Sequence, residues 1–192
     1  MVSVESTMLP LGSEAPAFTL PDPSGHLVSL EDVAGPEGTL VAFVCNHCPY
    51  VRHIATEIGR AAARWVDAGI GVVGINSNDA DAYPDDRPEV MAKQAAEWGW
   101  SFPYLVDADQ SVAIDYRAAC TPDFFLFDSS RRLVYRGRFD SARPNNGQPI
   151  TGEELDAAVQ AVVAGEVPTD DQWPSLGCNI KWRPGNEPAW AP

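Results

Sequence analysis

The sequence is poor in positive charge and in cysteine, and it contains no long hydrophobic run. Only 13 lysine and arginine residues stand against 27 aspartate and glutamate residues, so the formal net charge is −14 at pH 7. So acidic a surface repels phosphate backbones and anionic lipids, which argues against nucleic acid and membranes as partners. No window approaches the roughly 18 apolar residues of a membrane-spanning helix. Residues 1–7 have neither a basic nor an apolar stretch, so we expect no signal peptide and a cytoplasmic location.

What is present is the composition of a folded protein. Hydrophobic residues make up 45% and charged residues 21% of the 192 residues, which is ordinary for a globular chain and argues against disorder. A chain of this length buries a substantial core without needing disulfides to fold. Its four cysteines are too few for a disulfide scaffold, so their positions have to be explained individually.

Hydrophobic patterning predicts strands that alternate with helices. The predicted strands are 17–20, 27–30, 39–44, 71–76, 104–106, 124–127 and 133–137, and the predicted helices are 51–66, 88–98 and 111–117. A capping box formed by Thr151 and Glu154 predicts the start of a last helix, which Gly165 ends. Alternation of this kind indicates parallel βαβ units, and the closing hairpin adds an antiparallel edge. The first two strands predict an N-terminal β-hairpin.

The last part of the chain differs from the rest. Five of the 17 prolines and three of the six tryptophans fall in residues 166–192. Prolines keep such a segment extended, while its tryptophans indicate that it packs against something. We therefore expect one domain over residues 1–165 and an extended C-terminal tail over 166–192 that packs on it.

Cys45 and Cys48 form a CxxC motif between a predicted buried strand and a predicted helix. Residues three apart in a first helical turn have Cβ atoms about 5–6 Å apart. A disulfide requires about 3.5–4.5 Å, so a small adjustment makes or breaks the bond. The positive end of a helix lowers the pKa of a thiol. We expect Cys45, at the helix tip and more exposed, to be the nucleophile, and Cys48 to be the resolving thiol.

Two further features support this site. His47 donates a hydrogen bond to the Cys45 thiolate or holds a positive charge beside it; the alternative is an exposed loop histidine. Thr121 and Pro122 stand at the start of a predicted strand, where a cis bond is plausible and a trans bond is the alternative. A cis-proline facing the CxxC leaves the preceding backbone unpaired, which predicts an edge where an extended substrate is added as a strand.

Four segments carry a resemblance to a known family. Residues 11–20, 43–51, 120–127 and 174–182 resemble redoxin-type proteins of the thioredoxin fold, in the thioredoxin-like or alkyl hydroperoxide reductase/thiol-specific antioxidant subgroup. The resemblance implies an α/β thioredoxin-like fold with a central mixed β-sheet flanked by helices. It also implies Cys45 and Cys48 as the redox centre and Pro122 as the cis-proline. The Asn46–His47 pair between the cysteines resembles the dipeptide of protein disulfide isomerases.

The sequence departs from this family at three positions. Val44 stands where thioredoxins have a tryptophan, and Thr39 stands where they have a buried acid. Peroxiredoxins require a threonine or serine three residues before the peroxidatic cysteine, and that position before Cys45 is Ala42. The proton acceptor of thioredoxins is thus missing or comes from elsewhere, and Ala42 favours disulfide exchange over peroxide reduction.

The remaining thiols have open roles. Strand alternation directs Cys120 away from the side on which Thr121 faces Cys45, which predicts an inert core residue. Cys178, in the tail, is either a third redox partner or a buried thiol that anchors the tail.

The sequence thus predicts a thiol–disulfide oxidoreductase that acts on protein or low-molecular-weight thiols and disulfides. We expect an upstream thiol to reduce it, with no metal and no cofactor beyond its redox-active disulfide. Two alternatives remain. One is a thiol-dependent peroxidase, and the other is a metal-binding domain built from Cys45, His47, Cys48 and a distant cysteine.

Overall fold

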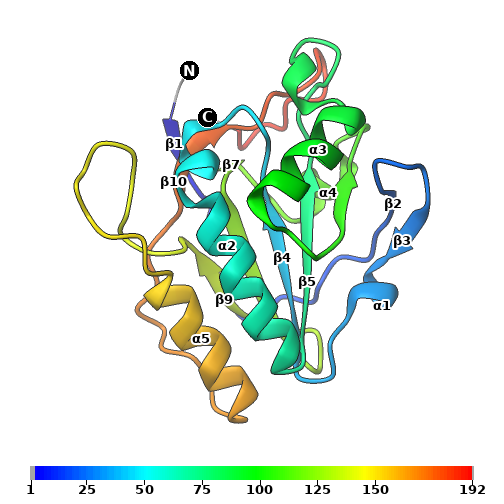
Figure 1. Cartoon of the computed structure of the whole chain (residues 1–192). Helices are drawn as coiled ribbons and strands as arrows, with labels where there is room; N and C mark the ends of the chain where they lie inside the picture. The colour runs from blue at the N-terminus through cyan, green and yellow to red at the C-terminus, as the bar shows by residue number, and fades with distance from the viewer. Residues whose placement is uncertain (1–2, 192) are drawn as a thin grey trace.

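The computed structural model describes residues 3–191, and a five-stranded mixed sheet lies at its centre (Figure 1). The strands, in spatial order, are β6 (Tyr104–Val106), β5 (Ile70–Asn76), β4 (Gly38–Phe43), β8 (Asp123–Asp128) and β9 (Leu133–Gly137). The first three run parallel to one another, and β8 and β9 add an antiparallel hairpin. This arrangement confirms the predicted mixed sheet of a thioredoxin-like fold.

Helices cover both faces of this sheet. They are α1 (Leu30–Val33), α2 (Pro49–Asp67), α3 (Pro88–Trp98), α4 (Ser111–Asp115) and α5 (Glu153–Val163), with one 3-10 turn, η1 (Pro84–Asp86). Helices α2, α3 and α5 pack on the face that carries Leu40 and Ala42. Helices α1 and α4, with the N-terminal segment, pack on the face that carries Val41 and Phe43. Because β4 is buried on both faces, it reads in the sequence as an unbroken apolar run.

The predicted N-terminal hairpin is present as β2 (Thr19–Pro21) and β3 (Leu27–Ser29), which pair antiparallel. Directly after it, Ser29 begins α1. Its hydroxyl accepts from the Asp32 N–H, and the Asp32 carboxylate accepts from the Ser29 N–H. This reciprocal cap is the pattern expected of a serine followed three residues later by an acid.

A second, three-stranded sheet was not predicted, and it joins the two ends of the chain. Its order is β1 (Ser3–Glu5), β10 (Leu176–Asn179) and β7 (Cys120–Thr121), and both pairings are antiparallel. In Figure 1 it lies at the end of the molecule where β4 leads into α2. The tail thus returns to the end of the fold that carries the CxxC motif.

The start of α5 differs from the predicted capping box. The helix begins after Gly152, and the Thr151 hydroxyl makes only a long contact of 3.4 Å to the Glu153 N–H. Glu154 pairs with Arg138 and so does not fold back on the helix start. The carboxylate of Asp140 accepts from both the Thr151 and the Gly152 N–H at 2.7 Å. Asp140 therefore holds the two residues that lead into the helix, and no side chain caps its first turn.

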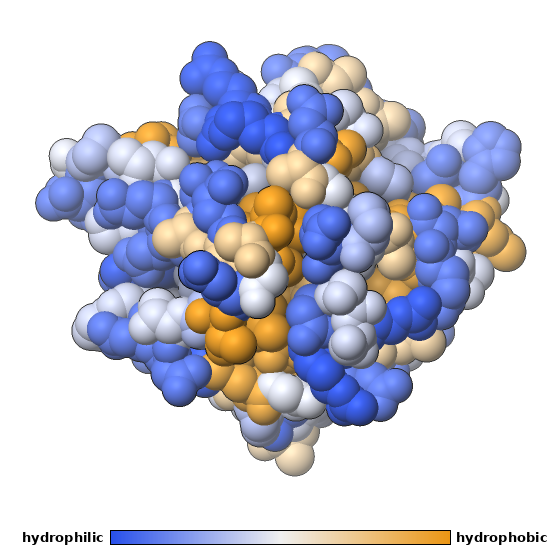
Figure 2. Space-filling model, turned by 90° about the horizontal axis from the view of Figure 1, so that it is seen from below, coloured by the Kyte–Doolittle hydropathy of each residue, from blue (hydrophilic) through white to orange (hydrophobic). Residues whose placement is uncertain are grey.

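The opposite end of the molecule carries an apolar hollow. It measures about 290 Å³, and Val33, Pro36, Val66, Ile70 and Phe102 are among the residues that line it. Figure 2 looks at this end and shows apolar side chains at the surface between hydrophilic ones. The length of α2 separates the hollow from the CxxC motif. Among the described residues, no helix has the length and apolar character needed to cross a membrane.

The hydrogen bonds of Asp140 lead to a prediction that contrasts Asp140 with Thr151. Leaving buried backbone N–H groups without their acceptor costs about 1–3 kcal/mol. We expect Asp140→Ala to lower the free energy of unfolding by that amount and Thr151→Ala to change it by less than about 0.5 kcal/mol. Urea denaturation of the two variants measures both values. A larger loss of stability in Thr151→Ala than in Asp140→Ala would contradict this and support the capping box predicted from the sequence.

Candidate functional site

The two cysteines of the motif lie at the start of α2, but not as the sequence predicted. The helix begins at Pro49, and Cys48 is its N-cap, so Cys45 lies in the loop that follows β4. Proline suits the first helical position because its ring fixes φ and no N–H is needed there. Both cysteines are 0% exposed. The predictions that Cys45 opens the helix and is the more exposed thiol are therefore wrong.

The structure brings both sulfur atoms to the Thr121–Pro122 peptide bond, which is cis. The Cys45 Sγ lies 3.3 Å from the Thr121 hydroxyl. The Cys48 thiol donates to the Thr121 carbonyl oxygen at 3.1 Å. Thr121 thus contacts both thiols, and it faces Cys45 as predicted.

The backbone before Pro122 is not a free edge. Strand β10 pairs with β7, so that Cys178 stands opposite Thr121 and Asn179 stands opposite Cys120. The prediction of an unpaired edge that receives a substrate strand is therefore wrong, because the C-terminal tail of the same chain occupies that edge.

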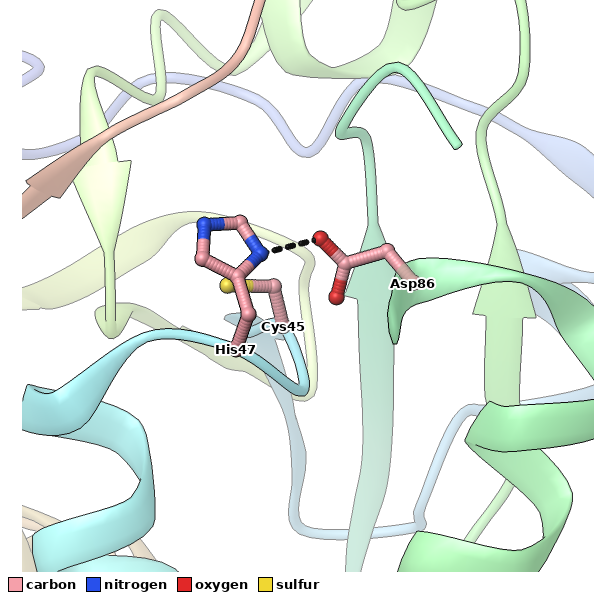
Figure 3. A group of neighbouring side chains, drawn as sticks. All are labelled: Cys45, His47 and Asp86. Carbon is pink, nitrogen blue, oxygen red and sulfur yellow. Dashed lines mark hydrogen bonds and ion pairs between the residues drawn. The ribbon is translucent and has the colours of Figure 1, made fainter. Parts of the chain in front are cut away.

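His47 pairs with an aspartate that the sequence did not single out. Its Nδ1 lies 2.6 Å from the Asp86 carboxylate (Figure 3). Among the described residues, no hydrogen bond joins the imidazole to Cys45. The same carboxylate accepts from the Asn46 N–H at 2.7 Å and from the Asn78 side-chain amide at 2.9 Å. Although burial opposes the charged form, hydrogen bonds from His47 and Asn78 hold the pKa of Asp86 below its ordinary value.

A stack of side chains covers the motif. The Tyr83 ring lies parallel to the His47 imidazole, with 5.2 Å between ring centroids. The Lys181 ammonium group lies 5.8 Å from the centre of the Tyr83 ring. On the other side, the Asn46 side chain bonds the Asp85 carbonyl and the Tyr104 hydroxyl. These contacts explain why neither sulfur reaches solvent.

Sequence reasoning missed Tyr83, Asp86 and Lys181. Asp86 lies in a segment, residues 77–87, that contains four aspartates and reads as a solvated loop. Asp79 and Asp86 are both buried, and no local pattern distinguishes Asp86, because its partners come from the CxxC loop and from Asn78. The lysine lies in the tail, and only the pairing of β10 brings it to this end of the fold.

The electrostatics of the two thiols are opposite to the prediction. Hydrogen bonds from the Cys178 and Cys45 thiols lower the pKa of Cys48 far below its ordinary value, against the effect of burial. Burial raises the pKa of Cys45, and the hydrogen bond to Cys48 and the nearby Asp86 carboxylate raise it further. The position at the N-terminus of α2 also favours charge on Cys48. These shifts favour the thiolate on Cys48, which must then give up the proton that its thiol donates to the Thr121 carbonyl oxygen.

The other two cysteines lie in different places. Cys120 packs with Val4 and Ala119 in a small cluster, and burial raises the pKa of its thiol. Cys178 belongs to the same buried cluster as Cys45 and Cys48, and its thiol hydrogen-bonds Cys48. The structure thus assembles three thiols at the site and leaves Cys120 outside it.

One set of side chains has the composition of a metal site. Cys45, His47 and Asp86 each offer a ligand atom, and these atoms all lie within 4.8 Å of one another (Figure 3). Zinc is bound by cysteine, histidine and carboxylate ligands of this kind. The set differs from the predicted one, because Asp86 takes the place of Cys48 and of the distant cysteine.

Comparison with solved structures supports the fold. A crystal structure of an uncharacterized conserved protein from Geobacillus kaustophilus is 50% identical, covers 96% of this chain and 98% of its own, and superposes with a TM-score of 0.94. A putative thiol:disulfide interchange protein DsbE from Chlorobium tepidum is 22% identical with a TM-score of 0.63, covering 81% of this chain and 99% of its own. The latter likeness concerns the fold alone.

Comparison with known sequences places residues 11–136 in a match to the AhpC/TSA family. A putative peroxiredoxin of Mycobacterium tuberculosis is 33% identical over 108 residues, which span 56% of this chain and 64% of the relative, less than two thirds of its length. The thiol-disulfide oxidoreductase ResA of Bacillus thuringiensis is 21% identical over 124 residues, which cover 65% of this chain and 67% of the relative. The relatives' names thus include both peroxide and disulfide chemistry.

The charge distribution among the thiols is testable with single variants. We expect Cys45→Ser to keep a thiolate at pH values well below the ordinary thiol pKa of about 8.5, and Cys48→Ser to lose it. Cys178→Ala removes the strongest donor to Cys48, so it raises the pKa of Cys48. Thiolate absorbance in the ultraviolet, followed against pH, measures all three. A thiolate that survives in Cys48→Ser and disappears in Cys45→Ser would contradict this assignment.

Proposed function

The chain belongs to the AhpC/TSA family, and from this we propose that it is a thiol–disulfide oxidoreductase whose reacting pair is Cys45 and Cys48. The observation that carries the proposal is the arrangement of the two thiols. They belong to one buried cluster, and both contact Thr121 directly before a cis-proline. A thiolate is the nucleophile in disulfide exchange, and the site offers one place where a thiolate is stabilised.

The reaction proceeds by two exchanges. The Cys48 thiolate attacks one sulfur of a substrate disulfide, the substrate bond breaks, and one half leaves as a thiolate that takes up a proton. Cys45 then loses its proton and attacks the Cys48 sulfur of the mixed disulfide. The second half of the substrate leaves as a thiol, and the Cys45–Cys48 disulfide remains. An upstream thiol restores the reduced pair by the reverse sequence. These roles of Cys45 and Cys48 are the reverse of those predicted from the sequence.

Asp86 has a positioning role in this scheme. It holds the Asn46 N–H and the His47 imidazole, and these are the two residues between the cysteines. Holding both fixes the loop that joins Cys45 to Cys48, so the two sulfur atoms stay within reach of each other. Preorganisation of this kind reduces the entropy that disulfide closure would otherwise cost.

The surroundings of the pair favour small substrates. Strand β10 occupies the edge on which an extended polypeptide would pair, and both sulfur atoms are 0% exposed. The net charge of −14 disfavours anionic molecules. A small, uncharged disulfide needs no strand edge and is not repelled by the acidic surface, so it is the substrate class that fits best, and it reacts once the side chains that cover the sulfur atoms move aside.

Peroxide reduction is a second candidate, favoured by the family and by the name of the M. tuberculosis relative. Against it stands Ala42, which is 2% exposed and offers no hydroxyl to a peroxide. The Thr121 hydroxyl contacts Cys45, the thiol with the raised pKa. The hydroxyl therefore lies beside the Cys45 sulfur, whereas the thiolate is on Cys48. This separation suits disulfide exchange better than peroxide cleavage.

Metal binding is a third candidate, favoured by the cluster of Cys45, His47 and Asp86. In that cluster the His47 Nδ1 and the Asp86 carboxylate are joined by a hydrogen bond of 2.6 Å. When Nδ1 donates this bond, the imidazole has its lone pair on Nε2 alone, so Nδ1, the Asp86 carboxylate and Cys45 do not bind one ion together. The arrangement therefore fits a histidine–aspartate pair better than a ligand set.

Reduction of bis(2-hydroxyethyl) disulfide, a small neutral disulfide, tests the main proposal. With dithiothreitol as the reductant, we expect turnover by the wild-type protein, a lower rate in Cys45→Ser, and a fall to the uncatalysed rate in Cys48→Ser. Cys120→Ala is the matched control, because it removes a buried thiol outside the site and leaves turnover intact. Wild-type rates in Cys48→Ser would overturn the proposal.

The two other candidates have their own measurements. We expect hydrogen peroxide to be consumed more slowly than the neutral disulfide when both are supplied at equal concentration. We also expect only trace zinc in the purified protein and no change of disulfide turnover after treatment with a chelator. Faster peroxide turnover would replace the proposal with a peroxidase, and stoichiometric zinc that inhibits exchange would replace it with a metal site.

A further inference from the structure

We propose that Cys178 is a second disulfide partner of Cys48, so that the disulfide of the oxidised protein passes between Cys45–Cys48 and Cys48–Cys178. The inference rests on the proposed function, because the first disulfide must form before it can move. Its evidence is separate, and comes from the strand that carries Cys178.

The register of β10 directs the Cys178 side chain into the site. In an antiparallel pair, residues that stand opposite each other project from the same face of the sheet. Cys178 stands opposite Thr121, and the Thr121 side chain contacts the Cys45 sulfur. Cys120 precedes Thr121 in the strand and projects to the other face. One register thus explains why Cys178 reaches the pair and Cys120 does not.

The position of β10 depends on a glycine. A Cβ atom at Gly177 would collide with the carbonyl oxygen of Thr121, so only glycine permits this approach of the two backbones. On its other side β10 pairs with β1, where Gly177 stands opposite Val4 and Cys178 opposite Ser3. Strands on both sides therefore hold Cys178 against the start of α2, and Figure 1 shows β10 beside the N-terminal end of that helix.

Cys45 and Cys178 are both neighbours of Cys48. All three side chains belong to one buried cluster, and Thr121, which Cys178 stands opposite, contacts both other sulfur atoms. Sulfur atoms gathered around one residue need only a small movement to reach the S–S bond length of about 2.05 Å. Cys48 can therefore form a disulfide on either side.

The exchange balances without an external oxidant. The Cys178 thiol gives up its proton, and its sulfur attacks the Cys48 sulfur of the Cys45–Cys48 disulfide. The Cys48–Cys178 bond forms as the Cys45–Cys48 bond breaks, and the Cys45 sulfur leaves as a thiolate that takes up the proton. One disulfide is present before and after the step, so no electrons enter or leave. The oxidising equivalent comes from the substrate disulfide that formed the Cys45–Cys48 bond.

The product ties the C-terminal tail to α2. With Cys48 bonded to Cys178, strand β10 is covalently held over the Thr121 edge, and Cys45 is left as a thiol. Whether the tail is covalently attached to α2 therefore depends on the oxidation state of the three thiols.

Peptide mapping by trypsin separates the two disulfides. Cys45 and Cys48 both lie in the tryptic peptide 1–52, Cys120 lies in 118–131, and Cys178 lies in 139–181 because trypsin does not cut before Pro144. A Cys45–Cys48 disulfide stays within one peptide, whereas Cys48–Cys178 joins 1–52 to 139–181. The probe is the neutral disulfide bis(2-hydroxyethyl) disulfide, and mass spectrometry under non-reducing conditions is the readout.

We expect the 1–52/139–181 pair in oxidised Cys45→Ser, where Cys48 has Cys178 as its remaining neighbour, and its loss in Cys45→Ser/Cys178→Ala. Cys45→Ser/Cys120→Ala is the matched control and should retain the pair. A disulfide within peptide 1–52 of the wild-type protein, with no linked pair in Cys45→Ser, would overturn the inference and leave the proposed function standing. Absence of both disulfides would overturn the proposed function itself.

Gly177→Ala supplies a second test that changes no thiol. In the Cys45→Ser background it forces β10 away from Thr121, so we expect at least a several-fold lower yield of the linked pair. Circular dichroism shows whether the variant folds. An undiminished yield in a folded Gly177→Ala variant would contradict the role of the strand register.

Discussion

The gathering of Cys45, Cys48 and Cys178 around Thr121 is the arrangement on which the rest of the site depends. A thiolate without water needs donors from the protein, and burial alone would keep all three sulfur atoms protonated. Two neighbouring thiols and the N-terminus of α2 supply that stabilisation at Cys48. Every other feature of the site either brings these sulfur atoms together or keeps water away from them.

Two segments distant in sequence create this dry environment. Residues 83–86 place Tyr83 and Asp86 on His47, and the tail places Lys181 over Tyr83. Strand β10 meanwhile occupies the edge beside Pro122. The ends of the chain therefore belong to the site, since β1 supports β10 and β10 carries Cys178. In the proposed reaction the tail completes the reacting centre, and the thioredoxin-like fold alone supplies only its first two thiols.

The sequence predicted what local patterns determine. Strand β4 is an apolar run, α2 has a 3.6-residue period, and the two hairpins have recognisable turns, so these elements and the Cys45–Cys48 motif were found correctly. The pairing of β10 was not predictable, because a strand of four residues has too little alternation to be read and its partners are far away in sequence. The prediction that Cys45 is exposed was wrong for the same reason, since the residues that bury it are distant in sequence. Asp86 is hidden among the other aspartates of its loop.

Carbon-13 spectra of the cysteine β-carbons test the central claim most directly, because oxidation to a disulfide shifts a β-carbon signal strongly. The protein labelled at its four cysteines is recorded reduced and then with one equivalent of neutral disulfide. The account predicts that the Cys48 signal moves completely, that the Cys45 and Cys178 signals each move in part, and that the Cys120 signal stays. A Cys48 signal that stays in place, or a Cys120 signal that moves, would contradict it.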